Sequence, residues 1–294
     1  MVLQVVLNGY FRSGTTILWH LLRLSQPDKL HLHEPFHPKL LWHLNHHLGV
    51  EDPMHMIPLW DDYVKLDGST LRTLIEVTKT LDGSPVTWLE AKPVIEALDR
   101  DSHDIYIKCV RAHAILPFLA NHYDVQIYHI IRCPACTWID HFDAMDLRDV
   151  DTLLGINPTY NYADRFYLLN TYKKLKQMFD VPFKANNYLD MFVYNWVVSN
   201  YLAVTKTAEF DNFEVVLYEE CVDNDVLRKL GIGNAYYYMF KPYMPCMHYP
   251  IIHRIIAEII HNTPLKQLYT AIDDYTHLDR YYRILNPIHY ADTK

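Results

Sequence analysis

The segment at residues 3–25, LQVVLNGYFRSGTTILWHLLRLS, limits the fold of this chain more than any other. An apolar run at residues 5–7 has the length of a buried strand, Gly9 and Gly14 bound the loop after it, and apolar residues then recur at helical spacing. The first amides of such a helix have no partner within it and share its partial positive charge. The segment therefore predicts a strand, a loop and a helix whose start binds an anion.

The loop has the spacing Gly9-x4-Gly14-Thr15-Thr16, which is the Walker A pattern with Thr15 in place of the lysine. That lysine reaches the β- and γ-phosphates, so its absence disfavours a nucleoside triphosphate. Arg12 lies inside the loop instead, and its planar guanidinium can bind two oxygens of a phosphate or a sulfonate. An ordinary glycine turn between a strand and a helix is the alternative.

Alternating predicted strands and helices indicate an α/β fold, with a parallel sheet flanked by helices on both faces. We expect one domain over 1–294, a helical C-terminal region over about 232–294, and a surface excursion at 50–67. The predicted strands lie near 3–8, 29–33, 105–111, 125–132 and 213–218. The predicted helices lie at 15–25, 38–48, 69–81, 112–122, 134–146, 164–179, 186–208, 223–230 and 250–262.

Charge and hydropathy exclude two classes of partner. The net charge is −8 and basic stripes are lacking, which argues against nucleic acid. No run of about 18 apolar residues occurs, and no signal peptide pattern follows Met1. The sequence therefore predicts a cytoplasmic protein without a transmembrane segment, and it leaves the oligomeric state open.

Five segments together resemble PAPS-dependent sulfotransferases, and the carbohydrate branch more than the aryl branch. YFRSGTT at 10–16 resembles the 5′-phosphosulfate loop PRSGTT, with Phe11 in place of proline, and the resemblance extends over about residues 3–230. The resemblance implies a P-loop-like sulfotransferase fold. It also implies transfer of a sulfuryl group from PAPS to a hydroxyl of a small-molecule or glycan acceptor, such as a carbohydrate or glycolipid. The product would be adenosine 3′,5′-bisphosphate, and the reaction would need no metal. The other segments are HEPF at 33–36, IKCVR at 107–111, the strand and helix at 127–141, and VVLYEE at 215–220.

The resemblance also implies roles for residues near the ends of the predicted strands. Glu34 would be the general base, with a helix cap near Pro38 as the alternative. Arg132 would bind the 3′-phosphate, with a surface ion pair as the alternative. Arg111 and His33 would bind the acceptor, with a structural pairing as the alternative for Arg111. The phosphosulfate would be held by Arg12, which is also catalytic, and by Ser13, Gly14, Thr15 and Thr16.

Two positions complicate these assignments. The family has a serine eight residues after the arginine, where this chain has Asp140, and a carboxylate repels phosphate. We expect one of three outcomes. Asp140 turns away from the phosphate, Thr137 or another hydrogen-bond donor compensates for its charge, or the sulfuryl donor is not ordinary PAPS. Lys108 and Arg111 are three residues apart and should face opposite sides of a strand, so we expect only Arg111 to face the crevice.

Four other functions remain open. A P-loop kinase would explain the loop, and Asp140 favours a non-catalytic nucleotide-binding protein. Cys133-Pro134-Ala135-Cys136 after a strand is typical of thiol redox proteins. His31 and His33 beside Glu34 are a candidate zinc set, although the proposed chemistry requires no metal.

Overall fold

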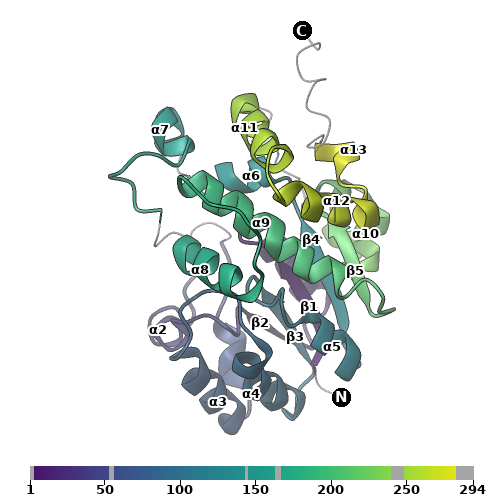
Figure 1. Cartoon of the computed structure of the whole chain (residues 1–294). Coiled ribbons are helices and arrows are strands. Elements are labelled where there is room, and N and C mark those ends of the chain that lie inside the picture. Colours follow the sequence, from purple (N-terminus) through teal and green to yellow (C-terminus); the bar gives the residue numbers. More distant parts are fainter. Residues whose placement is uncertain (1–2, 53–55, 143–144, 163–166, 240–247, 283–294) are drawn as a thin grey trace.

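The computed structural model describes residues 3–52, 56–142, 145–162, 167–239 and 248–282 (Figure 1). Its centre is a five-stranded sheet in the order β2-β3-β1-β4-β5, and all neighbouring strands are parallel. This confirms the predicted α/β fold, and each strand lies within two residues of its predicted bounds. The strands are β1 (Leu3–Gly9), β2 (Leu30–His33), β3 (Ile105–Cys109), β4 (Gln126–Ile131) and β5 (Phe213–Leu217).

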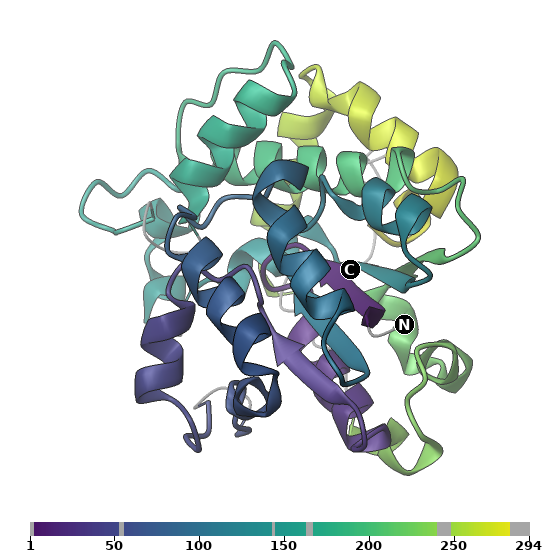
Figure 2. The same cartoon turned by 90° about the horizontal axis from the view of Figure 1, so that it is seen from below.

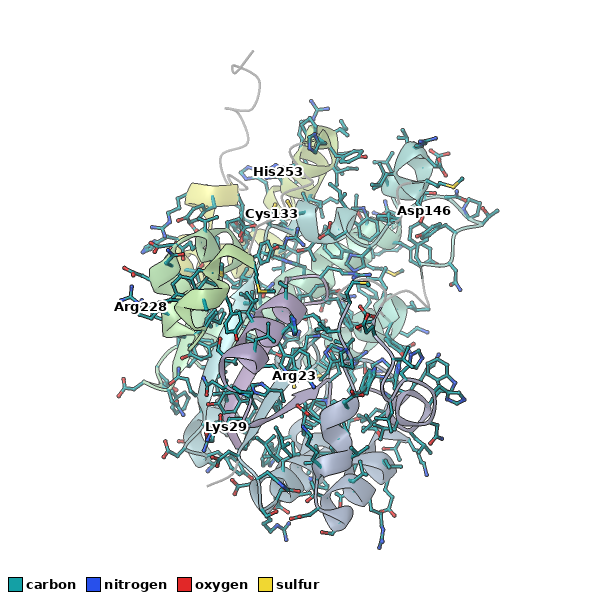
Figure 3. The ribbon with its side chains drawn as sticks, turned by 180° about the vertical axis from the view of Figure 1, so that it is seen from behind. Arg23, Lys29, Cys133, Asp146, Arg228 and His253 are labelled. Atoms are coloured by element: carbon teal, nitrogen blue, oxygen red, sulfur yellow. The ribbon has the colours of Figure 1, made fainter. Side chains whose placement is uncertain are left out.

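Burial of the strands on both faces explains their apolar composition. Every residue of β2 and β3 is buried, as expected for a parallel sheet covered by helices on each side. The helix α1 (Thr15–Ser25) packs on β1, β2 and β3, whereas α9 (Tyr188–Thr205) packs on β4. Figure 1 shows α9 in front of the sheet, and the view from behind in Figure 3 shows α1 in front of it, so these helices cover opposite faces.

The remaining helices extend these two layers. Figure 2 shows α9 and α12 above the sheet and α10 below it. Their bounds are α2 (Leu40–His46), α3 (Gly68–Thr78), α4 (Trp88–Asp99), α5 (Leu116–His122), α6 (Pro134–Ile139), α7 (Val150–Leu153), α8 (Leu168–Met178), α10 (Asn224–Lys229), α11 (Pro250–His261), α12 (Leu265–Thr276) and α13 (Asp279–Tyr282). Within the predicted helical C-terminal region, residues 250–282 contain α11, α12 and α13, while 240–247 and 283–294 lie outside the described residues.

Three predictions about this frame were wrong. The helix expected at 134–146 ends at Ile139, and 143–144 lie outside the described residues. The helix α4 was missed, although Thr87 and Glu90 form a capping box at its start, because Pro93 stands within it. The stretch 50–67 is not only a surface excursion, since its Trp60 is 5% exposed.

Candidate functional site

A pocket of about 490 Å³ opens at the carboxyl ends of the strands. It lies where the chain turns from β1 towards one side of the sheet and from β4 towards the other, which is where parallel sheets bind ligands. All predicted site residues except Ser13 line it, namely Arg12, Gly14, Thr15, Thr16, His33, Glu34, Arg111 and Arg132. We call the part around 12–16 and Arg132 the anion end.

The backbone of the loop after β1 favours glycine at position 14. Gly14 has a φ of 86°, and a Cβ atom there would lie 2.2 Å from Cε2 of Tyr218. Arg12 also has a left-handed backbone, with a φ of 62°. Helix α1 begins at Thr15 without a side-chain cap, so its first amides remain directed at the pocket.

Ser13 is the predicted residue that the structure places elsewhere. Its side chain is buried beneath the loop, since a Cβ atom on Gly9 would lie 2.4 Å from Ser13 Oγ. Its backbone N–H donates to the Tyr10 carbonyl at 3.1 Å. The predicted role of Ser13 in anion binding therefore has no support in this geometry.

Glu34 lies between two cations at the middle of the pocket. Its carboxylate accepts from Lys108 Nζ at 2.5 Å and from Arg111 Nη1 at 2.6 Å, and all three side chains are at most 5% exposed. The backbone of Glu34 is left-handed, with a φ of 55°, which is uncommon outside glycine and occurs often at functional sites. The alternative role as a helix cap fails, because α2 follows Lys39 and has no side-chain cap.

The expectation that only Arg111 faces the crevice was wrong, since Lys108 lines it too. Strand β3 ends at Cys109, so the alternation of sides does not continue to Arg111. Arg111 is held firmly: its Nε donates to the Gly83 carbonyl at 2.9 Å, and its guanidinium lies 5.0 Å from the Phe11 ring and 5.1 Å from the Tyr167 ring.

Arg132 is buried at the anion end and contacts three groups. It forms an ion pair with Asp140, donates to the Arg12 carbonyl at 2.9 Å, and lies 4.6 Å from the Tyr218 ring. Asp140 thus faces the pocket rather than turning away. Thr137 is completely buried and does not line the pocket, so it does not compensate for the carboxylate there.

Tyr218 was not among the predicted site residues. It follows β5 directly and covers Gly14 as well as Arg132. Its position immediately after an apolar strand was the available signal, because strand ends in a parallel sheet meet at one edge.

Aromatic rings line the opposite part of the pocket, which we call the ring end: His37, His43, Trp60 and Tyr167. The rings of His43 and Trp60 stack at 4.3 Å with an interplanar angle of 11°. The ring of His37 lies 4.6 Å from His43 and 5.8 Å from Trp60. None of these four residues was among the predicted site residues. His43 lies on α2, and the other three lie outside the helices and strands named above.

Hydrogen bonds from neighbouring residues fix Trp60 in place. Asp62 accepts from the His31 backbone N–H at 3.0 Å, and the Tyr63 hydroxyl donates to the His33 carbonyl at 2.9 Å. Arg23, labelled in Figure 3, donates to the Pro58 carbonyl at 2.7 Å. The segment is thereby attached to β2 and α1 on both sides of the indole.

The imidazoles of the ring end are uncharged at neutral pH. Burial, and then the charge of Arg111, lower the pKa of His37 far below its ordinary value. Burial also lowers the pKa of His43 to about 4. The Lys39 N–H donates to Nδ1 of His37 at 3.1 Å, which places the His37 proton on Nε2.

The zinc and redox alternatives find little support. In the described part of the chain, the residues whose ligand atoms converge are Asp67, Asp101 and His103, not His31 and His33. Cys133 and Cys136 are at most 2% exposed, and α11, which carries the labelled His253 of Figure 3, packs against α6. Burial of both thiols disfavours thiol exchange.

Comparisons with known proteins add little to the geometry. No family model matches the chain. An uncharacterized protein of Archaeoglobus fulgidus is 28% identical over 246 residues, which cover 74% of this chain and 79% of the relative. The crystal structure of retinol dehydratase in complex with androsterone and inactive cofactor PAP aligns with 99% of this chain and 82% of its own, at 12% identity and a TM-score of 0.31. A score this low carries no conclusion about ligand or activity.

Helix length and composition bear on one further prediction. Within the residues that the structure describes, no helix is both long enough and apolar enough to cross a bilayer.

Proposed function

We propose that this chain is a sulfotransferase that moves a sulfuryl group from PAPS to a hydroxyl acceptor and releases adenosine 3′,5′-bisphosphate. The observation that carries the proposal is the pairing, in one pocket, of an anion loop lacking the Walker lysine with a buried carboxylate between two cations. The first feature suits a phosphosulfate better than a triphosphate, and the second supplies a base and positive charge. The resemblance to carbohydrate sulfotransferases supports the same reaction.

The proposed reaction assigns one task to each group. Glu34 takes the proton of the acceptor hydroxyl, the acceptor oxygen forms a bond to sulfur, and the bond between sulfur and the oxygen of the 5′-phosphate breaks. The amides of residues 14–16 and the guanidinium of Arg12 offset the charge that develops on the leaving phosphate. His33 and Arg111 contact the acceptor, and Arg132 the second phosphate.

Each oxygen of Glu34 accepts from one cation, which stabilises the charged carboxylate, so opening one ion pair makes it a stronger base. Arg111 is bound to the Gly83 carbonyl and lies between two aromatic rings, whereas the Nζ atom of Lys108 has Glu34 as its salt-bridge partner. The pair with Lys108 is therefore the one that opens. The released ammonium would then be available to an oxygen of the sulfonate.

Calorimetry with adenosine 3′,5′-bisphosphate and with ATP plus magnesium tests the nucleotide assignment. We expect binding of the bisphosphate and at least tenfold weaker binding of ATP. Binding of ATP alone would instead support the P-loop kinase.

Glu34→Gln tests the base. We expect turnover to fall by roughly 10²- to 10⁴-fold, with bisphosphate affinity within about threefold of the parent protein. The substitution leaves two buried cations without a counterion, so Glu34→Gln/Lys108→Met serves as a folding control that removes one of them. Undiminished turnover in either variant rejects Glu34 as the base.

A non-catalytic nucleotide-binding protein is the second candidate, because Asp140 already occupies Arg132. Incubation with labelled donor and a panel of sugars, glycolipids and phenols separates the two. Tight bisphosphate binding without transfer to any acceptor would favour the binding protein.

A further inference from the structure

We propose that Glu219 and Tyr282 are positioning residues for Arg132, and that they determine how strongly the anion end prefers a nucleotide with two separate phosphates. Tyr282 is the last residue of α13, so the C-terminal helices contribute to nucleotide specificity although none of their described residues lines the pocket. The preference for a second phosphate rests on the proposed function. The positioning of Arg132 follows from the contacts of the described residues.

The backbone on both sides of Arg132 contacts one pair of side chains. The N–H of Cys133, the residue after Arg132, donates to Glu219 Oε1 at 3.1 Å. The Tyr282 hydroxyl donates to Glu219 Oε2 at 2.7 Å. That hydroxyl also lies 3.5 Å from the carbonyl oxygen of Ile131, the residue before Arg132. Both peptide groups that flank Arg132 are therefore held by this pair.

Burial makes these hydrogen bonds difficult to replace. Glu219 is 9% exposed and Tyr282 is 1% exposed, so water is a poor substitute for either partner. The same helix is attached to the next residue along the chain, because Arg280 and the Tyr281 hydroxyl both donate to Glu220 Oε1. Helix α13 thus contacts two consecutive carboxylates directly after β5.

Glu219 also connects Arg132 to the ring that packs on it. Glu219 directly follows Tyr218, whose ring lies 4.6 Å from the Arg132 guanidinium and covers Gly14. A shift between the ends of β4 and β5 would therefore move the guanidinium relative to the loop at 12–16. Neither Glu219 nor Tyr282 lines the pocket, so they act on a ligand only through the placement of Arg132.

The ratio of the affinities for adenosine 3′,5′-bisphosphate and adenosine 5′-monophosphate tests this placement by calorimetry. Tyr282→Phe should lower the ratio at least fivefold by weakening only the bisphosphate, whereas a general loss of structure would weaken both nucleotides. Tyr281→Phe is the matched control, because it removes a hydroxyl bonded to Glu220 at an exposed site of the same helix, and it should leave the ratio unchanged. An unchanged ratio in folded Tyr282→Phe overturns the inference if the parent protein prefers the bisphosphate.

Two substitutions of Glu219 separate its hydrogen bonds from its charge. Glu219→Ala removes both bonds and should lower the ratio at least tenfold. Glu219→Gln retains an acceptor for the Cys133 N–H and can donate to the Tyr282 oxygen, so it should keep the ratio within about threefold of the parent value. A glutamine variant as impaired as the alanine variant contradicts a positioning role.

Hydrogen exchange measures the same effect without any nucleotide. Tyr282→Phe should make the Cys133 amide exchange at least fivefold faster, and Tyr281→Phe should leave its exchange unchanged. Unchanged exchange in Tyr282→Phe overturns the inference. A parent protein that binds both nucleotides equally contradicts the second phosphate of the proposed function, and the exchange rate then still decides whether this pair holds Arg132.

Discussion

The anion end and the ring end of the pocket are built in different ways. At the anion end, Gly14 follows β1, Arg132 follows β4 and Tyr218 follows β5, so the parallel sheet itself brings them together. At the ring end, Trp60 and Tyr167 come from segments outside the sheet and are positioned by side-chain contacts. Backbone pairing therefore fixes one end, and individual side chains fix the other.

Gly14→Ala is the change expected to have the largest effect on the anion end alone. A methyl group there would meet the Tyr218 ring at 2.2 Å in a left-handed backbone. We expect bisphosphate affinity to fall at least 30-fold and the free energy of unfolding by roughly 2–3 kcal/mol, measured by calorimetry and urea denaturation. Gly68→Ala is the matched control at a helix start, because nothing lies within 4 Å of its Cβ position. Unchanged bisphosphate affinity in folded Gly14→Ala would contradict an anion site at this loop.

Acidification should weaken the core beneath the anion end. His129 of β4 is completely buried, its Nδ1 accepts from Asn8 at 2.9 Å, and its Nε2 donates to Asn200 at 2.9 Å. Burial lowers its pKa to about 4, so the unfolded chain binds the proton more tightly. Stability should therefore fall as the pH drops from about 6.5 to about 4, by about 3 kcal/mol from this residue.

Urea denaturation across this pH range measures the effect. His129→Gln should flatten the pH dependence, even though it lowers stability overall, and His46→Gln at an exposed site should not. A slope unchanged in His129→Gln would contradict the assignment.

Asp140→Ser should strengthen ligand binding at the anion end and leave the ring end unchanged. Removing the carboxylate frees the guanidinium of Arg132, with which it forms an ion pair. We expect affinity for adenosine 3′,5′-bisphosphate to rise about tenfold, corresponding to roughly 1.4 kcal/mol, while affinity for adenosine 5′-monophosphate changes little. If the ratio of the two affinities stays constant, Arg132 does not bind the second phosphate.

Tyr63→Phe should have the smallest effect, confined to the ring end. The variant loses the hydrogen bond to the His33 carbonyl, which is worth about 1 kcal/mol, and loosens the segment that holds Trp60. We expect the free energy of unfolding, measured by urea denaturation, to fall by about 1 kcal/mol and bisphosphate affinity to stay constant. Tyr128→Phe, which removes an exposed hydrogen bond to the Lys229 carbonyl, is the control and should lower the free energy of unfolding by less.

Sequence reasoning succeeded where local patterns determine structure. The apolar runs predicted all five strands, and helical spacing predicted Thr15–Ser25 at its observed bounds. The residues that directly follow β1, β2 and β4 were recognised for the same reason, since strand ends in parallel sheets share an edge.

The failures occurred where tertiary contacts override local patterns. The early end of β3 brought Lys108 and Arg111 to the same carboxylate, and no local signal marks such an end. Trp60 looked like part of a loop because its burial depends on partners in β2 and α1 that are distant in sequence. Ser13 matched a motif, but the packing of its side chain on Gly9 was invisible without coordinates.

The clamped guanidinium of Arg111 has a thermodynamic consequence. It contacts Phe11, in the loop after β1, and Tyr167, at the ring end, and it also pairs with the carboxylate of Glu34. A ligand that shifts either aromatic ring changes the surroundings of the other through this one rigid group. We therefore expect a ligand at the ring end and a nucleotide at the anion end to change each other's affinity by the same factor, whichever of them binds first.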